Sequence, residues 1–184
     1  MKIAILGTRG IPNNYGGFEQ CAECLSVGLS KKGYDVTVYS PDFHPYKKQN
    51  YKGVKIQHIY SPQNYLGSAA SNFVFDYLSL KHAVKQKFDI ILELGLITAA
   101  PAIIFCNKGS SIIVTNLDGL EWKRAKWSPA VRSITKWLEK FGVRNSNYLV
   151  ADNIAIQEYI KINYGINSES VSYTHLRAHE TDRY

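Results

Sequence analysis

Cysteine is scarce in this chain of 184 residues, which has only Cys21, Cys24 and Cys106. So small and odd a number cannot supply a disulfide framework and suits a reducing compartment. Cys21 and Cys24 match C-x-x-C, but no second pair accompanies them and Cys21 falls inside a predicted helix, so packing is the favoured role. The histidines between residues 44 and 82 are too scattered for a metal site. We therefore predict a cytoplasmic protein without a bound metal.

Long hydrophobic runs are also lacking. The longest apolar stretch, residues 94–106, is interrupted by Pro101 and is shorter than the roughly 20 residues of a membrane-spanning helix. The N-terminal apolar run meets Arg9 without a small-residue cleavage site, so we expect no signal peptide. These observations predict that the chain does not cross a membrane.

Acidic residues are fewer than basic ones, 15 against 22, and the formal net charge is +7. Such an excess favours anionic partners, for example phosphorylated substrates or the inner leaflet of a membrane. No nucleic-acid-binding module is evident in the sequence. We therefore expect no nucleic acid among the partners.

Apolar runs that suit buried strands alternate with stretches of helical periodicity, and a hydrophobic content of 45% can support one good core. This regular alternation predicts an α/β fold of one domain, a Rossmann-like, doubly wound and mostly parallel sheet with ligand sites at the carboxyl ends of its strands. The predicted strands are residues 2–6, 35–40, 54–60, 89–92, 111–115 and 148–151. The predicted helices are residues 18–32, 69–87, 98–106, 128–141 and 154–162.

The first strand joins the first helix through the segment GTRGIPNNYGGFE, which contains four glycines. A helix that begins after such a loop offers unpaired N–H groups and the positive end of its dipole, and glycines let a phosphate approach the backbone. We predict that Gly16, Gly17 and Arg9 bind a diphosphate. The alternative is that Gly16 and Gly17 only permit a turn with positive φ before the helix.

The spacing of these glycines differs from the dinucleotide fingerprint, which requires G-x-G-x-x-G directly after the strand and an acidic residue at the end of the second strand. Here Thr8 and Arg9 separate Gly7 from Gly10, and the second predicted strand ends before Asp42. The spacing therefore disfavours a nicotinamide cofactor and an oxidoreductase, and we predict no cofactor.

Polar residues follow two later strands at the edge where ligands are expected. Asp118 comes after the strand at 111–115 and could accept the proton of an attacking hydroxyl, although an Asp before a helix also forms local turns. Lys123 and Arg124 could bind a pyrophosphate or form a solvated basic turn. Glu93 and Gly95 follow another strand and should line the same cleft, although Glu93 could instead cap the next helix.

The helix predicted at 128–141 has two adjacent stripes. Basic residues beside aromatic ones suit docking onto an anionic membrane, but the same pattern describes a surface helix packed on a sheet. The basic stripe contains Arg132, Lys136 and Lys140, with Trp137 beside it. The apolar stripe, predicted to be buried, contains Trp127, Val131, Ile134, Leu138 and Phe141.

The motif GTRGIPNNYGGFE together with DGLEWKR at 118–124 resembles the N-terminal domain of bacterial family-4-type glycosyltransferases, in particular the group that includes rhamnosyltransferases of capsule and surface-polysaccharide assembly. The resemblance covers residues 1 to about 170. It implies half of a GT-B fold, whose first loop touches the diphosphate of a nucleotide-sugar donor and whose strand ends hold the acceptor. It further implies retaining, metal-independent transfer of a sugar, such as rhamnose, to a lipid-linked saccharide. The alternative function is a non-catalytic domain that binds a nucleotide or phosphate.

The last residues, 171–184, resemble a translated sequencing adapter and lack a sustained apolar stripe. We therefore expect the natural domain to comprise residues 1–170 and to be followed by a donor-binding domain that this chain lacks.

Overall fold

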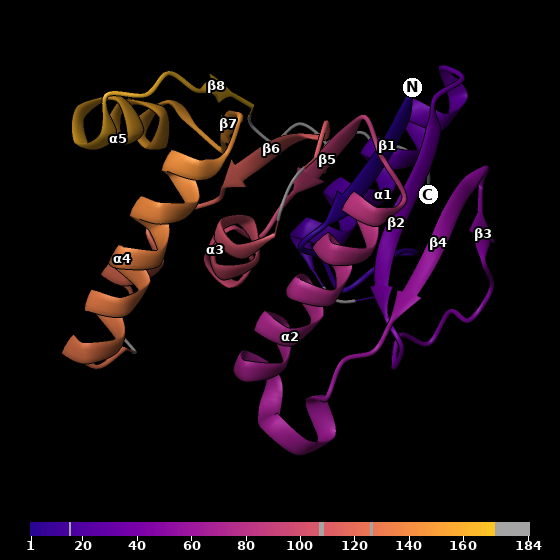
Figure 1. The fold of residues 1–184 in the computed structure, drawn as a ribbon, viewed down its shortest axis with the longest axis horizontal. Coiled ribbons are helices and arrows are strands. Elements are labelled where there is room, and N and C mark those ends of the chain that lie inside the picture. Colours follow the sequence, from indigo (N-terminus) through magenta and orange to yellow (C-terminus); the bar gives the residue numbers. More distant parts are fainter. Residues whose placement is uncertain (15, 107–108, 126, 172–184) are drawn as a thin grey trace, which may run out of the picture.

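The computed structural model describes residues 1–14, 16–106, 109–125 and 127–171. These residues form an eight-stranded sheet in the order β3-β4-β2-β1-β5-β6-β7-β8 (Figure 1). Every neighbouring pair is parallel except β3 and β4. The predicted doubly wound, mostly parallel α/β fold is confirmed. The strands are β1 (Lys2–Leu6), β2 (Asp35–Pro41), β3 (Asn50–Tyr51), β4 (Val54–Ile59), β5 (Ile90–Glu93), β6 (Ile112–Leu117), β7 (Tyr148–Ala151) and β8 (Glu169–Ser170).

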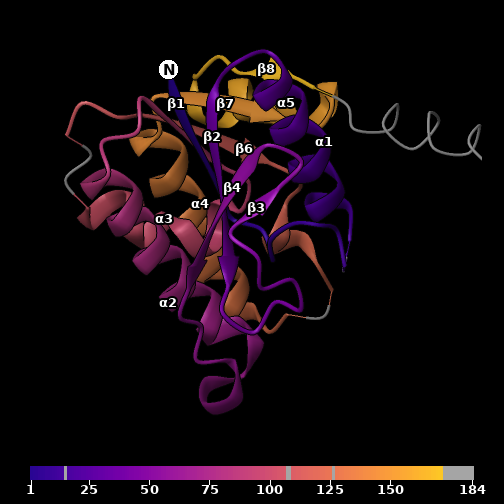
Figure 2. The ribbon, with the colours of Figure 1, turned by 90° about the vertical axis from the view of Figure 1, so that its right-hand side faces the viewer.

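Helices cover both faces of the sheet. Helix α1 lies on one face, and α2, α3 and α4 lie on the other (Figure 2). Alternate side chains of β1 point to opposite faces of the sheet. Ile3 and Ile5 pack with α1, whereas Ala4 and Leu6 pack with α2. The helices are α1 (Gly17–Lys31), α2 (Gln63–Lys85), α3 (Leu96–Phe105), α4 (Pro129–Asn145) and α5 (Ile154–Tyr164), with a 3₁₀ turn η1 (Glu121–Lys123).

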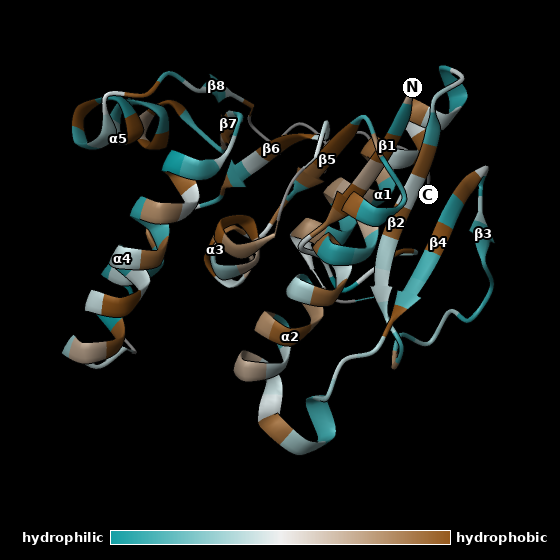
Figure 3. Ribbon diagram, in the orientation of Figure 1, coloured by the Kyte–Doolittle hydropathy of each residue, from teal (hydrophilic) through white to brown (hydrophobic). Residues whose placement is uncertain are grey.

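Helix α3 is apolar on all sides and lies between α2 and α4 (Figure 3). Its start differs from the prediction, since it begins at Leu96, and Pro101 therefore stands in its interior instead of its first turn. The backbone carbonyl of Gly95 accepts the first helical hydrogen bond, from the N–H of Ala99 at 3.3 Å. No periodicity in the sequence marks that start.

Helix α2 also begins earlier than predicted, at Gln63, but its chain is kinked at Gly67, where φ is 71°. The predicted helix at 69–87 corresponds to the part after this kink. Strands β3 and β8 were not predicted, because two residues are too few to show periodicity.

The strand order reverses beside β1. From β1 the chain winds outward through β2 to β4, and α2 then carries it back across the sheet to β5. Ile5 consequently pairs with Val38 on one side and with Leu92 on the other. The loops that follow β1 and β5 therefore flank the switch point, the place where open α/β sheets bind ligands.

Candidate functional site

The loop after β1 lies close to the ends of two neighbouring strands, and glycines stand at the points of contact. Gly7 and Gly10 have φ of +76° and +94°, a region that side chains rarely adopt. A Cβ on Gly7 would overlap the Glu93 carboxyl and the backbone of Gly95, and a Cβ on Gly10 would overlap the Ser40 side chain. Glycine is thus required at 7 and 10 by both conformation and space.

The start of α1 is open. Gly16 is the N-cap with a φ of −168°, and neither Gly16 nor Gly17 has a positive φ, so the alternative that these two glycines permit a positive-φ turn is wrong. No side chain caps the helix, and a Cβ on Gly17 would meet nothing within 4 Å. The first N–H groups of α1 therefore have no side-chain cap from the described residues, and the flank of Gly17 is open.

Two acidic side chains of α1 tie the loop to the helix. The Glu19 carboxylate, which is buried, accepts a hydrogen bond from the backbone N–H of Arg9 at 2.9 Å, and Glu23 accepts one from the N–H of Asn13 at 2.8 Å. Sequence analysis missed both roles. The one available signal was Glu19, an acidic residue in the first turn of the helix, where it also stabilises the helix dipole.

Beneath this loop lies a buried pair of carboxyl groups, Glu93 at the end of β5 and Asp76 on α2, which are 0% and 3% exposed. Glu93 Oε1 accepts from the Gly95 N–H at 3.2 Å, and the Asp76 side chain is hydrogen-bonded to Thr98. Burial raises the pKa of Asp76 from 3.8 to about 7. Burial, and secondly the Asp76 carboxylate, raise the pKa of Glu93 well above its usual value. At least one of the two therefore keeps its proton at neutral pH.

Asp118 directly follows β6 at the same edge of the sheet. Asp118 is exposed as a whole residue, but protein atoms surround its carboxyl group. This burial of the carboxyl, and secondly the charge of Asp152, raise the pKa of Asp118. Arg124 opposes the rise. Asp152 follows the adjacent strand β7, and Asn116 donates to it at 3.1 Å. Sequence analysis missed Asp152, because only the pairing of β6 with β7 brings it beside Asp118.

The basic residues after Asp118 have different surroundings. The Arg124 Nε lies 2.7 Å from Glu121 Oε2 in an ion pair. Lys123 is exposed, and its Nζ lies 5.4 Å from the ring centroid of Trp122. Lys123 is therefore the more accessible cation, whereas Arg124 is already neutralised.

The structure thus brings together two groups of the predicted site residues. Glu93 and Gly95 are in contact at the switch point together with Gly7, which was not predicted as a site residue, and the Glu93 side chain is wholly covered. Asp118 and Arg124 interact at the end of β6, the strand next to β5. Among the described residues, no group of three or more His, Cys, Asp or Glu residues could hold a metal ion.

Helix α4 buries Leu138 as predicted, but not every residue of the predicted apolar stripe. Ile134, predicted to be buried, is 58% exposed, and Trp137 is 54% exposed. Gly142 packs closely against Leu96 of α3, so the side of α4 that carries Gly142 faces the core. Glu139 is buried instead, and the hydroxyls of Tyr159 and Tyr164 each donate to its carboxylate at 2.6 Å. In the part of the chain that the structure describes, no helix is long and apolar enough to cross a membrane.

Comparison with known proteins places these features in a family. Residues 1–176 match the model of a family described as a domain of unknown function, DUF1972. No match was found among curated proteins.

Several solved structures share the fold. Sucrose-phosphate synthase from Thermosynechococcus elongatus superposes with a TM-score of 0.68 at 12% identity, over 93% of this chain and 47% of that one. A putative UDP-N-acetylglucosamine 2-epimerase from Listeria monocytogenes gives 0.52 at 13% identity, over 89% and 41%. UGT89C1 of Arabidopsis thaliana, solved in complex with UDP-L-rhamnose, gives 0.50 at 13% identity, over 93% and 51%. The chain spans about half the length of these proteins, and the likeness concerns the fold.

Proposed function

This chain belongs to the DUF1972 family, and we propose that it is the acceptor-side half of a glycosyltransferase. The complete enzyme transfers a sugar from a nucleotide-sugar donor to a lipid-linked saccharide, with retention of configuration and without a metal, in the assembly of a cell-surface polysaccharide. Rhamnose is the sugar that we propose to test first. The observation that carries the proposal is that the uncapped start of α1 and the polar ends of β5 and β6 lie at the carboxyl edge of one sheet, whose fold is shared with a protein solved in complex with UDP-L-rhamnose.

The donor diphosphate binds at the start of α1. Support comes from the uncapped N–H groups of that helix and from the open space before Gly17, with Gly16 extended beside it. The positive end of the helix dipole favours the negative charge of a diphosphate. Arg9, whose backbone Glu19 anchors, supplies a cation on the same loop.

Asp118 is the catalytic residue, and it deprotonates or positions the acceptor hydroxyl. It stands at a strand end with a raised pKa, which makes its carboxylate a stronger base than an ordinary aspartate. Gly119 follows it, and a Cβ there would meet nothing within 4 Å, so a substrate could approach the backbone at this point.

The acceptor occupies the space between the ends of β5 and β6. Gly95 contacts the acceptor directly. Glu93 acts through Gly95, because its carboxylate accepts a hydrogen bond from the Gly95 N–H. Lys123 and Arg124 bind the pyrophosphate of the lipid-linked acceptor; Arg124 exchanges its ion pair with Glu121 for this contact.

The enzyme works on the cytoplasmic side and touches the inner face of the plasma membrane through α4. Support comes from the exposed Ile134 and Trp137 side chains, which lie on the same helix as the exposed cations Lys136 and Lys140. Apolar side chains together with lysines suit an anionic bilayer surface.

The test is sugar transfer by the complete gene product. Purified protein is incubated with a panel of nucleotide sugars that includes a rhamnose donor, and with membranes that carry lipid-linked saccharides. Labelled sugar should pass to the lipid fraction in the wild type and fail to do so in Asp118→Asn. Donor binding without transfer in the complete protein would instead favour the non-catalytic nucleotide-binding domain.

A further inference from the structure

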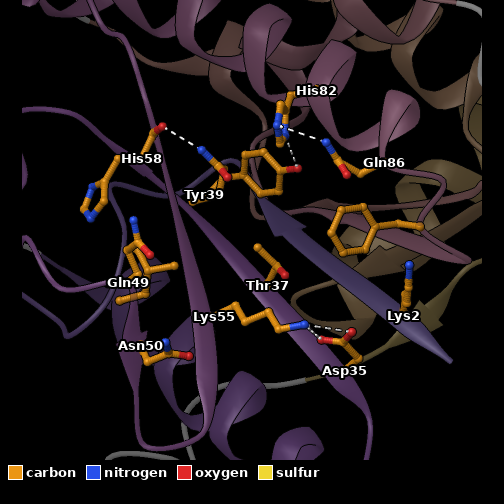
Figure 4. Close-up of a pocket in the computed structure, with 13 residues that line it drawn as sticks. Lys2, Asp35, Thr37, Tyr39, Gln49, Asn50, Lys55, His58, His82 and Gln86 are labelled. Carbon is orange, nitrogen blue, oxygen red and sulfur yellow. Dashed lines mark hydrogen bonds and ion pairs between the residues drawn. The ribbon is translucent and has the colours of Figure 1, made fainter.

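A cavity of about 680 Å³ lies on the α2 side of the sheet, beside β2 and β4 (Figure 4). Its lining includes Lys2 and Asp35, the first residues of β1 and β2, and extends to His58 near the end of β4. None of the residues proposed for sugar transfer belongs to this lining, and β2 and β4 lie on the other side of β1 from β5 and β6. The cavity is therefore separate from the proposed transfer site.

The cavity exists because one face of β2 and β4 is polar. In β2, Val36 and Val38 enter the core beneath α1, and Asp35, Thr37 and Tyr39 point to the opposite face. Helix α2 ends at Lys85 and leaves the first half of that face uncovered. Figure 4 shows His82 of α2 and Gln86, which follows that helix, on one side of the cavity, and Gln49 and Asn50, the first residue of β3, on the other.

Two of the charged groups of the lining satisfy one another. Lys55 Nζ lies 2.8 Å from Asp35 Oδ1, so these two exposed side chains form an ion pair. Lys2 also belongs to the lining, and within the described residues it forms no ion pair. The rings of Tyr39 and Phe88, which are 0% and 8% exposed, pack edge to face on each other, so neither offers a free face on which a base could stack.

Uncharged hydrogen-bonding groups remain. Thr37 is only 9% exposed, and within the described residues its hydroxyl has no hydrogen-bond partner in the protein. The side chains of Gln49 and Asn50 likewise make no hydrogen bond to the described part of the chain. Hydroxyl and amide groups both donate and accept hydrogen bonds, as sugar hydroxyls do, so a sugar unit can take the place of water at these groups.

We propose that this cavity is a second, non-catalytic site that binds a hydroxyl-rich sugar unit through Thr37, Gln49 and Asn50. Its volume falls within the roughly 300–1,000 Å³ of small-molecule pockets. Because Lys55, Gln86 and Asn50 are exposed, the cavity opens to solvent and can admit one unit of a longer saccharide. This site does not depend on the transfer activity of the complete enzyme.

The test uses the 184-residue chain labelled with ¹⁵N. L-rhamnose, D-glucose, D-mannose and the trisaccharide maltotriose are titrated one at a time, and amide shifts are recorded by NMR. At least one of these sugars should shift the amide signals of Thr37, Gln49 and Asn50. Shifts that appear only at Gly95 and Gly119, or no shifts with any of the four sugars, would overturn the proposal.

Variants separate this site from a surface effect. Thr37→Val keeps the shape of the side chain but removes its hydroxyl, and Asn50→Ala removes an exposed amide on the hairpin; each should weaken binding by about threefold to tenfold. Asn64→Ala, which removes an exposed amide of α2 outside the cavity, is the matched control and should bind as the wild type does. Equal affinity in all of these variants would contradict the assignment, and Asn50→Ala decides the question if Thr37→Val does not fold.

Discussion

The buried pair of Asp76 and Glu93 should make the stability of this fold depend on pH, and Asp76→Asn should remove the part of that dependence that Asp76 contributes. The pKa of Asp76 is raised in the folded chain from 3.8 to about 7, so the folded state binds a proton more tightly than the unfolded state does. Stability is therefore greatest when the pair is protonated. The free energy of unfolding falls as pH rises from about 4 to about 7.

The size of the effect follows from the pKa values. The interval from 3.8 to about 7 corresponds to about 4 kcal/mol. Between about pH 5 and about pH 8 the wild type should lose roughly 2.5 kcal/mol of that amount, because part of it is already lost below pH 5. Asn has the shape of Asp and keeps an oxygen for Thr98, but it carries no charge. Asp76→Asn should therefore be more stable than the wild type at about pH 8, by up to about 4 kcal/mol.

Urea unfolding followed by tryptophan fluorescence at the two pH values measures these differences directly. Glu158→Gln is the matched control, because Glu158 is an exposed carboxylate of α5, and this variant should keep the pH dependence of the wild type. A wild type whose unfolding free energy is equal at both pH values would refute the reasoning. So would an Asp76→Asn variant that is less stable than the wild type at the higher pH.

Four further predictions concern the proposed transfer site. Gly17→Val should lower donor affinity about tenfold or more in calorimetry, because its side chain fills the open space before α1, while Gly28→Val, farther along that helix and also in open space, should leave affinity unchanged. Asp118→Asn should reduce the turnover of the complete enzyme by about a hundredfold or more with donor binding unchanged. The activity of the wild type should fall as pH falls through the raised pKa of Asp118. Near-normal turnover of Asp118→Asn would show that this residue only forms a turn. Gly7→Ala should destabilise the chain by at least about 1–3 kcal/mol in urea unfolding, because its φ is +76° and its Cβ would overlap Glu93, and an unchanged midpoint would contradict that packing. This chain alone should transfer no sugar in the assay of the complete enzyme, because the cleft has one wall, and measurable transfer would show that a second domain is not needed.

The alternation of elements could be predicted from the sequence because it depends on local periodicity. β1, for example, is a short apolar run whose side chains enter the core on both faces, and such a run is typical of an interior parallel strand. The loop from Gly7 to Gly17 could likewise be recognised by composition, since glycine has few other reasons to be so dense between a strand and a helix.

The roles within that loop could not be assigned in the same way. Gly7 and Gly10 have the positive φ values and the tight contacts, whereas Gly16 and Gly17 have neither. The difference comes from Glu93 and Ser40, which lie on other strands and meet the loop only after the sheet has assembled.

The sequence by itself determined that this chain is an α/β protein with glycines and carboxylates at the ends of its strands, because those features follow from residue type and spacing. Only the tertiary structure decided which of them meet. Asp76 is separated from Glu93 by 17 positions, and Asp152 from Asp118 by 34, so no local pattern joins them. The packing of α2 against β5 and the pairing of β6 with β7 place these carboxyls together, and the same long-range packing buries Glu139 and turns Ile134 outward.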